Sequence, residues 1–197
     1  MAPTIDLAQR DTYVPETGWH RDSREAPLPS EAPGAPELNG VFAAACHILE
    51  QYSFPPARLI RGRFDPIAPL ANRAMLLTAR YLWMTFELPV RVSRIIDVTR
   101  VGVNGTEQAW GYSYQTLAGH LERGEITFEI VKQITSGEIA FRIHSFSQTG
   151  QITNPFYRLG FWIVGRKLQR RFAEESLRNM QRLLAPLAAR HITGTAP

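Results

Sequence analysis

The middle of the chain alternates apolar and polar residues with a period of two, which predicts a series of antiparallel strands. Trp110, Tyr112 and Tyr114 fall on one face of such a strand, and Asn104-Gly105 just before it is a strong hairpin signal. Further strands are predicted in ARLIRGRFDP, VSRIIDVTRV, EITFEIVKQ and EIAFRIHSFSQ. Short turns join most of these segments, so we expect an antiparallel meander.

Helical spacing appears on either side of this region. A first helix is predicted from about Glu37 to Tyr52, where the paired prolines of SFPPARL end it. The run AMLLTARYLWMTFEL fits helix or strand by periodicity, and its β-branched and aromatic residues favour a bent strand or two short ones. A long last helix is predicted to begin at Asn154-Pro155 and to end at Pro186.

This order of elements predicts an α+β fold, in which a curved antiparallel sheet of about six or seven strands wraps around a long C-terminal helix. The helix is the only predicted element long enough to cover one face of the sheet, and we expect a ligand cavity between them. Residues 1–38 are rich in Pro, Glu, Asp and Ser without periodicity, which predicts a loosely structured arm. We expect residues 39–190 to form one domain and residues 191–197 a flexible tail.

Positive charge is concentrated near the C-terminus, where eight Lys and Arg residues lie between Arg158 and Arg190, most of them in the predicted last helix. A basic helix can bind nucleic acid or anionic lipid, but the sheet needs its apolar stripe and no nucleic-acid-reading motif accompanies it. We therefore predict no nucleic-acid partner. No apolar stretch reaches the roughly 18 residues of a membrane span, so stable membrane insertion is not expected. The lone Cys46 and the absence of a signal peptide favour the cytoplasm, and the sequence makes no prediction of oligomeric state.

Four stretches resemble one known family: FPPARLIRGRFDP, YxxLxGHLERGE from Tyr114 to Glu125, FRIHSFS from Phe141 to Ser147, and NPFYRLGFWIVGRKLQRRFAEESLRNM. On these motifs, over about residues 45–185, the chain is similar to the bacterial and plant family catalogued as domain of unknown function nineteen-ninety. That family's pattern resembles the helix-grip superfamily, which includes START lipid-transfer domains, plant pathogenesis-related allergens and aromatic polyketide cyclases. The resemblance implies a deep cavity for a hydrophobic molecule, and it suggests a role in natural product biosynthesis.

Motifs for nucleotide, zinc and serine-hydrolase chemistry are absent from the sequence, so we predict no cofactor and no metal. His120, Glu122 and Glu125 in the GHLERGE motif could ligate a metal. We favour a structural role for this motif, in which Gly119 and Gly124 shape a loop and Glu125 pairs with a basic residue of the long helix.

Acid–base chemistry is possible at a few positions of the predicted strands. His144 could act as general acid or base, and Arg142 on the same face could bind a carboxylate or enolate. Asp97 has apolar neighbours that would raise its pKa, and Tyr114 completes the candidate catalytic set. The candidate ligand-binding residues are Trp110, Tyr112, Tyr81, Trp83, Phe128 and Phe161. For each residue the alternative is an ordinary core or surface position.

Two functions are compatible with this pattern. The first is a cofactor-independent enzyme that cyclises, dehydrates or isomerises a hydrophobic, polyketide-like molecule by positioning it and moving protons. The alternative is a carrier or sensor that binds a lipid-like ligand without chemistry.

Overall fold

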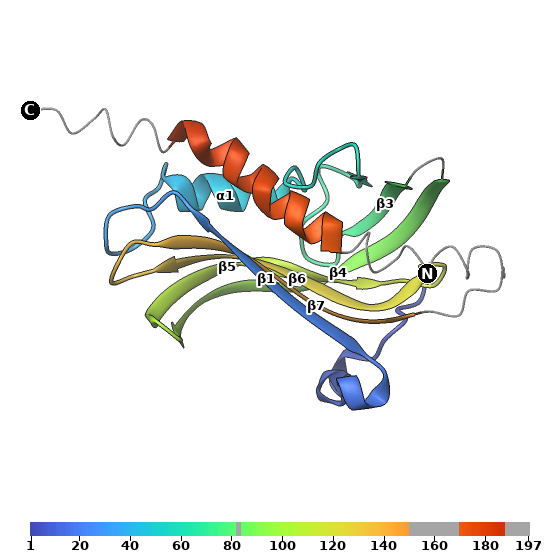
Figure 1. Ribbon diagram of the computed structural model, residues 1–197. Helices are drawn as coiled ribbons and strands as arrows, with labels where there is room; N and C mark the ends of the chain where they lie inside the picture. Colours follow the sequence, from blue (N-terminus) through green and yellow to red (C-terminus); the bar gives the residue numbers. More distant parts are fainter. Residues whose placement is uncertain (82–83, 150–169, 188–197) are drawn as a thin grey trace, which may run out of the picture.

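The computed structural model describes residues 1–81, 84–149 and 170–187 (Figure 1). Two short 3-10 helices, η1 (Leu7–Thr12) and η2 (Pro15–Thr17), open the chain, followed by strand β1 (His20–Leu28) and helix α1 (Val41–Glu50). The remaining strands are β2 (Ile60–Arg63), β3 (Ala74–Tyr81), β4 (Met84–Gly102), β5 (Gly105–Thr116), β6 (Glu122–Gln133) and β7 (Ile139–Thr149). Residues 170–187 form the C-terminal helix.

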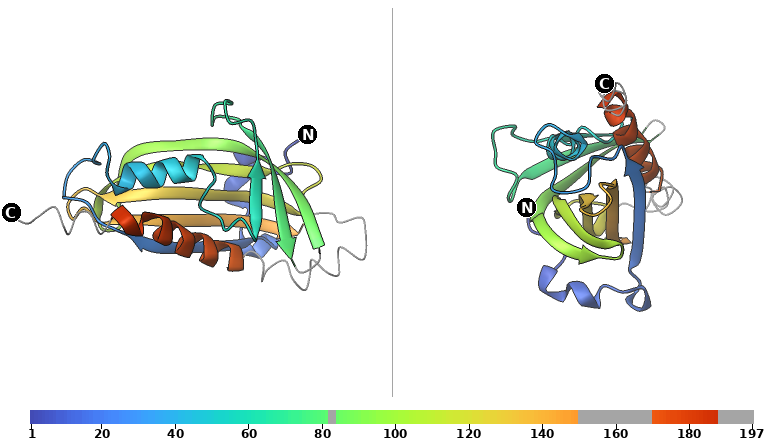
Figure 2. Two further views of the ribbon diagram at one scale, coloured as in Figure 1. Left: turned by 90° about the horizontal axis from the view of Figure 1, so that it is seen from above. Right: turned by 90° about the vertical axis from the view of Figure 1, so that its left-hand side faces the viewer.

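All seven strands belong to one antiparallel sheet in the order β1-β7-β6-β5-β4-β3-β2. The sheet is curved, and α1 and the C-terminal helix lie side by side over one of its faces (Figures 1 and 2). We call this helix-covered face the inner face and the opposite one the outer face. The α+β prediction of a sheet wrapped around a C-terminal helix is therefore confirmed.

Burial of aromatic rings on the inner face holds the two layers together. Tyr112, Phe128 and Phe141 are almost fully buried, and Phe54 packs on both phenylalanines with ring centroids 4.8 and 5.3 Å apart. The C-terminal helix adds a buried stripe to the same core, made of Ala173, Leu177, Met180 and Leu184. Their spacing of three or four residues is the apolar stripe that the sequence predicts.

The N-terminal region is not the loosely structured arm that its composition predicts. β1 pairs with β7 along its whole length, from His20 opposite Ser147 to Leu28 opposite Ile139. Ahead of β1, η1 and η2 lie on the outer side of the sheet (Figure 1), where Tyr13 and Trp19 pack on Phe146. The prediction over residues 1–38 is therefore wrong, because strand pairing and a small aromatic cluster stabilise a segment whose own sequence shows no period.

Other boundaries refine the expectations from the sequence. The ambiguous run AMLLTARYLWMTFEL forms two strands, β3 and the start of β4, as one of its two interpretations proposed. Pro89 lies inside β4, and the register of β4 with β5 shifts between Val92 and Arg94. The first helix is shorter than predicted, and the predicted start of the last helix at Asn154 lies outside the described residues.

Candidate functional site

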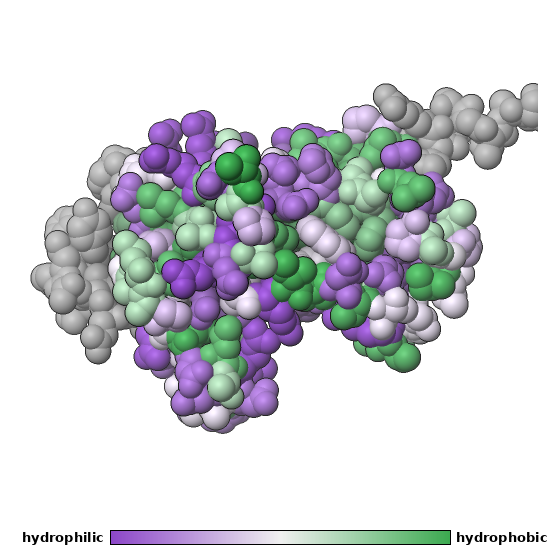
Figure 3. Space-filling view, turned by 180° about the vertical axis from the view of Figure 1, so that it is seen from behind, coloured by the Kyte–Doolittle hydropathy of each residue, from purple (hydrophilic) through white to green (hydrophobic). Residues whose placement is uncertain are grey.

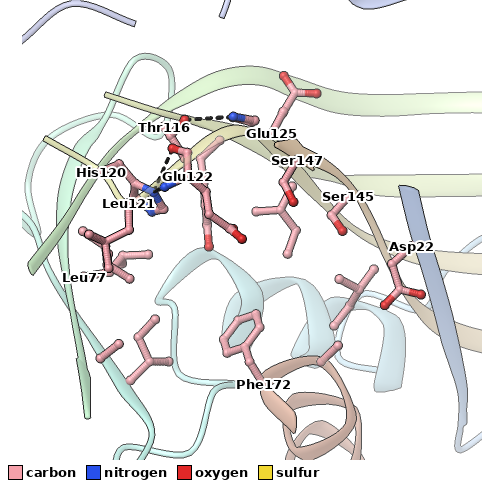
Figure 4. Close-up of a pocket in the computed structure, with 18 of the residues that line it drawn as sticks. Asp22, Leu77, Thr116, His120, Leu121, Glu122, Glu125, Ser145, Ser147 and Phe172 are labelled. Carbon is pink, nitrogen blue, oxygen red and sulfur yellow. Dashed lines mark hydrogen bonds between the residues drawn. The ribbon is translucent and has the colours of Figure 1, made fainter. Parts of the chain in front are cut away.

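A cavity of about 150 Å³ lies between the inner face of the sheet and the C-terminal helix (Figure 4). Its apolar lining includes Leu77 and Ala79 from β3, Leu88 from β4 and Ile143 from β7. Phe172 reaches into it from the C-terminal helix. Strands from almost the whole width of the sheet thus contribute to one small, largely apolar chamber.

One end of the cavity is polar. Tyr114 comes from β5, His120 from the loop after it, and Glu122 from the start of β6. Gly119 has a φ of 94° in this loop, a conformation that favours glycine and turns the chain toward β6. The short β5–β6 connection therefore brings the three polar side chains to one wall, and Figure 4 shows Glu122 directed toward Phe172.

His120 is held in its neutral form by its surroundings. Burial lowers the pKa of its imidazole to about 4, although a hydrogen bond with the Glu122 backbone partly opposes this shift. The backbone N–H of Glu122 donates to His120 Nδ1 at 3.0 Å. The Glu122 carbonyl oxygen, which can only accept, also lies 3.0 Å from Nδ1, so this nitrogen is within hydrogen-bond distance of both a donor and an acceptor. At neutral pH His120 is therefore a neutral imidazole, with one nitrogen that donates and one that accepts.

Tyr114 is the second neutral donor of this wall. Burial raises the pKa of its hydroxyl well above the usual value, so the hydroxyl keeps its proton. Tyr52 packs against it with ring centroids 6.4 Å apart, and burial likewise raises the pKa of Tyr52. The two tyrosine side chains also interact with each other, which raises the pKa of Tyr52 further and partly opposes the effect of burial on the pKa of Tyr114.

Hydrogen bonds of Thr116 hold the polar wall in place, and they join β5 to the start of β6 and to the N-terminal segment. Thr116 Oγ1 accepts a hydrogen bond from the Gly124 N–H at 3.0 Å, which closes the β5–β6 connection. Thr4 contacts the same hydroxyl from the N-terminal segment, and its N–H donates to the Thr116 carbonyl at 3.0 Å. On another side of the cavity, Asp22 and Arg24 of β1 form an ion pair at 3.3 Å.

The structure places only part of the predicted site at this cavity. Tyr114 lines it, whereas Tyr112 and Phe128 are buried in the core beside it. Trp110 is half-buried against the same core. Tyr81 lies in β3, but its side chain, like all of Trp83 and Phe161, is outside the described part of the structure.

The other three candidate catalytic residues lie away from the cavity. His144 is exposed on the outer face, where its Nδ1 lies 3.0 Å from the Ser23 hydroxyl. Arg142 shares that face and forms ion pairs with Glu25 at 2.6 Å and Glu107 at 3.0 Å. Asp97 is exposed and accepts a hydrogen bond from Gln108 at 3.1 Å, so the predicted apolar surroundings are absent. Strand alternation explains His144 and Arg142, because Phe141 and Ile143 take the inner positions of β7.

His120 and Glu122 line the cavity, although the sequence analysis did not place them among the candidate site residues. Both belong to the GHLERGE motif, which was the available signal, but we expected that motif to be structural. Glu125 of the same motif forms an ion pair. Its partner is Arg10 of η1 rather than a residue of the long helix, because Glu125 points to the outer face. The described residues contain no group of side chains suited to hold a metal.

A family model supplies the first comparison with known proteins. The family described as domain of unknown function (DUF1990) matches residues 4–179. The chain belongs to this family. The DUF1990 match begins at residue 4, well before the resemblance visible in the motifs, and therefore includes η1, η2 and β1. A search of curated proteins found no relative.

Solved structures show that this DUF1990 chain has the helix-grip fold. The protein Ara h 8.0201 aligns with a TM-score of 0.50 at 13% identity over 86% of this chain and 99% of its own. A Thalictrum norcoclaurine synthase mutant, solved with a transition-state analogue, gives 0.52 at 7% identity over 85% and 95%. A protein from Thermus thermophilus gives 0.50 at 12% identity over 85% and 98%. At such identities the likeness shows the fold alone.

Proposed function

We propose that this DUF1990 chain binds a small, mainly apolar molecule whose one polar group is a hydrogen-bond acceptor. The observation that carries the proposal is the cavity itself, apolar over most of its lining, with Tyr114 and His120 at one end. Both side chains are neutral at neutral pH and each has a group that can donate, so they suit a carbonyl, ether or similar oxygen. An acceptor buried there would replace its bonds to water with bonds to these donors.

The size of the cavity narrows the class of ligand. An apolar cavity of about 150 Å³ can hold a molecule of about the size of benzene. The enclosed part of a ligand therefore corresponds to one ring with a short substituent. A longer lipid or polyketide chain would have to extend beyond this chamber.

Filling the cavity tests the binding proposal. Ala79 is buried and lines the chamber, so Ala79→Phe should occupy the space of a ligand ring. We expect the wild-type protein to bind acetophenone, seen as NMR shift changes of the Leu77, Leu88 and Ile143 methyl groups. Ala79→Phe should weaken this binding by at least about tenfold, which corresponds to about 1.4 kcal/mol.

Ala74→Phe is the matched control, because Ala74 lies in the same strand but is exposed. It should bind acetophenone like the wild type. Equal affinity of the Ala79→Phe variant would contradict the proposal, and so would shift changes confined to residues outside the cavity. Alkyl phenyl ketones of increasing chain length would then define how far a ligand extends.

A second candidate function is catalysis in the same cavity, and the position of Glu122 beside the two donors favours it. The norcoclaurine synthase above is an enzyme by name and has the same fold. In a bound ketone, Tyr114 and His120 would donate hydrogen bonds to the carbonyl oxygen as it becomes an enolate. The Glu122 carboxylate would accept the proton of the neighbouring carbon as that C–H bond breaks. Such chemistry needs no cofactor.

Deuterium exchange separates this enzyme from a simple carrier. In D₂O, we expect the protein to accelerate loss of the acetophenone methyl proton signal by NMR. Tyr114→Phe and His120→Gln should each slow the exchange by about 10²-fold, the usual range for one such donor. Tyr112→Phe is the control, since Tyr112 does not line the cavity and its hydroxyl donates to the Leu49 carbonyl at 3.1 Å. Binding without accelerated exchange would identify a carrier.

A further inference from the structure

A second hollow, of about 370 Å³, lies on the outer side of the sheet, where the N-terminal segment passes beside it. We call it the outer crevice. Side chains from η1, β1, β6 and β7 line it. The segment that carries η1 and η2 protrudes from the body of the molecule on this side (Figures 1 and 3). Arg10, Arg21 and His144 line the outer crevice and not the inner cavity, whereas four residues line both: Asp22, Glu125, Ser145 and Phe146.

His144 lies at the centre of the crevice floor. In the sheet it stands opposite Ser23 of β1 on one side and Thr127 of β6 on the other. Ser23 engages its Nδ1 at 3.0 Å, and the Thr127 hydroxyl lies 2.8 Å from that of Ser113. The imidazole therefore has one nitrogen anchored to the neighbouring strand, while the exposed ring can present Nε2 to a ligand.

Two arginines flank this floor. Arg10 of η1 pairs with the buried Glu125, and its guanidinium lies over the Phe146 ring at 5.9 Å. Its Nε atom is buried without a hydrogen-bond partner among the described residues. Arg21 of β1 is exposed and uses its Nε to donate to the Tyr13 carbonyl at 3.0 Å. That bond orients the guanidinium group of Arg21, whose two terminal nitrogens can donate to another acceptor.

Most groups that remain for a ligand are donors. Of the carboxylates in the lining, Glu125 is paired with Arg10 and Asp22 with Arg24, so each of these pairs is balanced and Arg21 adds a positive charge beyond them. Asp11 is the remaining carboxylate of the lining. Arginine forks bind carboxylates and phosphates with two parallel hydrogen bonds, which lysine and neutral donors do not provide. An oxyanion satisfies this set better than a neutral or cationic group.

We propose that the outer crevice is a second ligand site, which binds the carboxylate or phosphate group of a small metabolite through Arg10, Arg21 and His144. The site exists only because η1 lies beside β6 and β7. It explains the position of the FRIHSFS motif, whose histidine does not reach the inner cavity. The proposal is independent of what the inner cavity binds.

Titration with inorganic phosphate, acetate and neutral acetamide tests this site, with calorimetry and the His144 ring signals in NMR as readouts. We expect one or both anions to bind and to shift the His144 signals, whereas acetamide should do neither. Arg21→Gln and His144→Asn should each weaken anion binding by about tenfold, the effect of one charge-assisted hydrogen bond. The anion that binds with higher affinity identifies the ligand group as a phosphate or a carboxylate. Arg63→Gln is the control, because Arg63 is exposed in β2 at the opposite edge of the sheet.

Arg21→Gln carries the test rather than Arg10→Gln, because loss of Arg10 would also leave the buried Glu125 without its ion-pair partner. Equal weakening by Arg21→Gln and Arg63→Gln would mean attraction by overall charge and would overturn the proposal. So would the absence of binding by either anion, or binding that leaves the His144 signals unchanged. Acetophenone binding to the same variants should be unaffected, which separates this site from the inner one.

Discussion

Glu31→Gln is expected to lower the free energy of unfolding by about 3 kcal/mol or more, because it leaves a buried lysine without its counter-charge. The side chains of Glu31 and Lys132 are both fully buried, and Lys132 Nζ donates to Glu31 Oε2 at 2.8 Å. Glu31 also accepts hydrogen bonds from the N–H groups of Phe42, at 2.7 Å, and Glu37, at 3.1 Å. Because Gly40 at the N-cap of α1 has no capping side chain, Glu31 takes that role.

Urea denaturation followed by circular dichroism would measure the loss. The matched control is the double variant Glu31→Gln/Lys132→Met, in which no buried charge is left. It should regain much of the lost stability, since replacement of both partners of a buried pair is often close to neutral. A single variant as stable as the wild type would show that Lys132 reaches solvent and that the pair contributes little.

The same pair gives stability a defined pH dependence. Burial by itself would raise the pKa of Glu31, but the hydrogen bonds from Lys132 and from the Phe42 and Glu37 N–H groups outweigh it and hold the pKa below its usual value. The unfolded chain therefore takes up this proton first. The contribution is complete above the ordinary glutamate pKa of about 4.3 and is lost as the pH falls through the lower folded value. Glu31→Gln should remove this part of the acid sensitivity.

Gly111→Ala is expected to have an effect of similar or larger size. A Cβ atom at this position in β5 would overlap the Phe128 carbonyl oxygen and would lie 2.9 Å from Glu129 Cα, both in the backbone of β6. The two central strands would have to separate, which would disturb the site wall that begins three residues later at Tyr114. We expect a loss of about 3 kcal/mol or more, or failure to fold, measured by thermal denaturation and the yield of soluble protein.

Gly105→Ala in the same strand is the control. Gly105 has a φ of 108°, but its added Cβ would come no closer than 4.0 Å to its nearest neighbour, the Thr135 hydroxyl. The variant should therefore lose only about 1 to 2 kcal/mol of stability, which is the cost of a positive φ for a residue with a Cβ atom. Equal losses in the two variants would mean that the close approach of β5 and β6 at Gly111 is not what makes glycine necessary there.

Local pattern predicted the elements whose residues bury one face against the core. Tyr112 and Tyr114 in β5, Phe128 in β6 and Leu177 in the C-terminal helix occupy inner positions because the periods of strand and helix place them there. The pattern could not predict β1, because its partner β7 lies more than a hundred residues away and supplies the hydrogen bonds that its polar sequence does not suggest. Composition therefore described residues 20–28 as irregular, whereas pairing across the sheet makes them a strand.

The candidate site divides in the same way. The sequence by itself determined the α+β helix-grip architecture, the place of Tyr114 on a core-facing strand, and the motif that contains His120 and Glu122. Only the tertiary structure decided which face each strand turns to the helices, and that choice removed His144, Arg142 and Asp97 from the cavity. The physical reason is that alternation specifies which residues share a face, but the inner face is defined by whatever buries it. Burial against Phe172 and Leu177 made one side of β7 part of a cavity wall, and the packing of η1 made its other side the floor of a crevice.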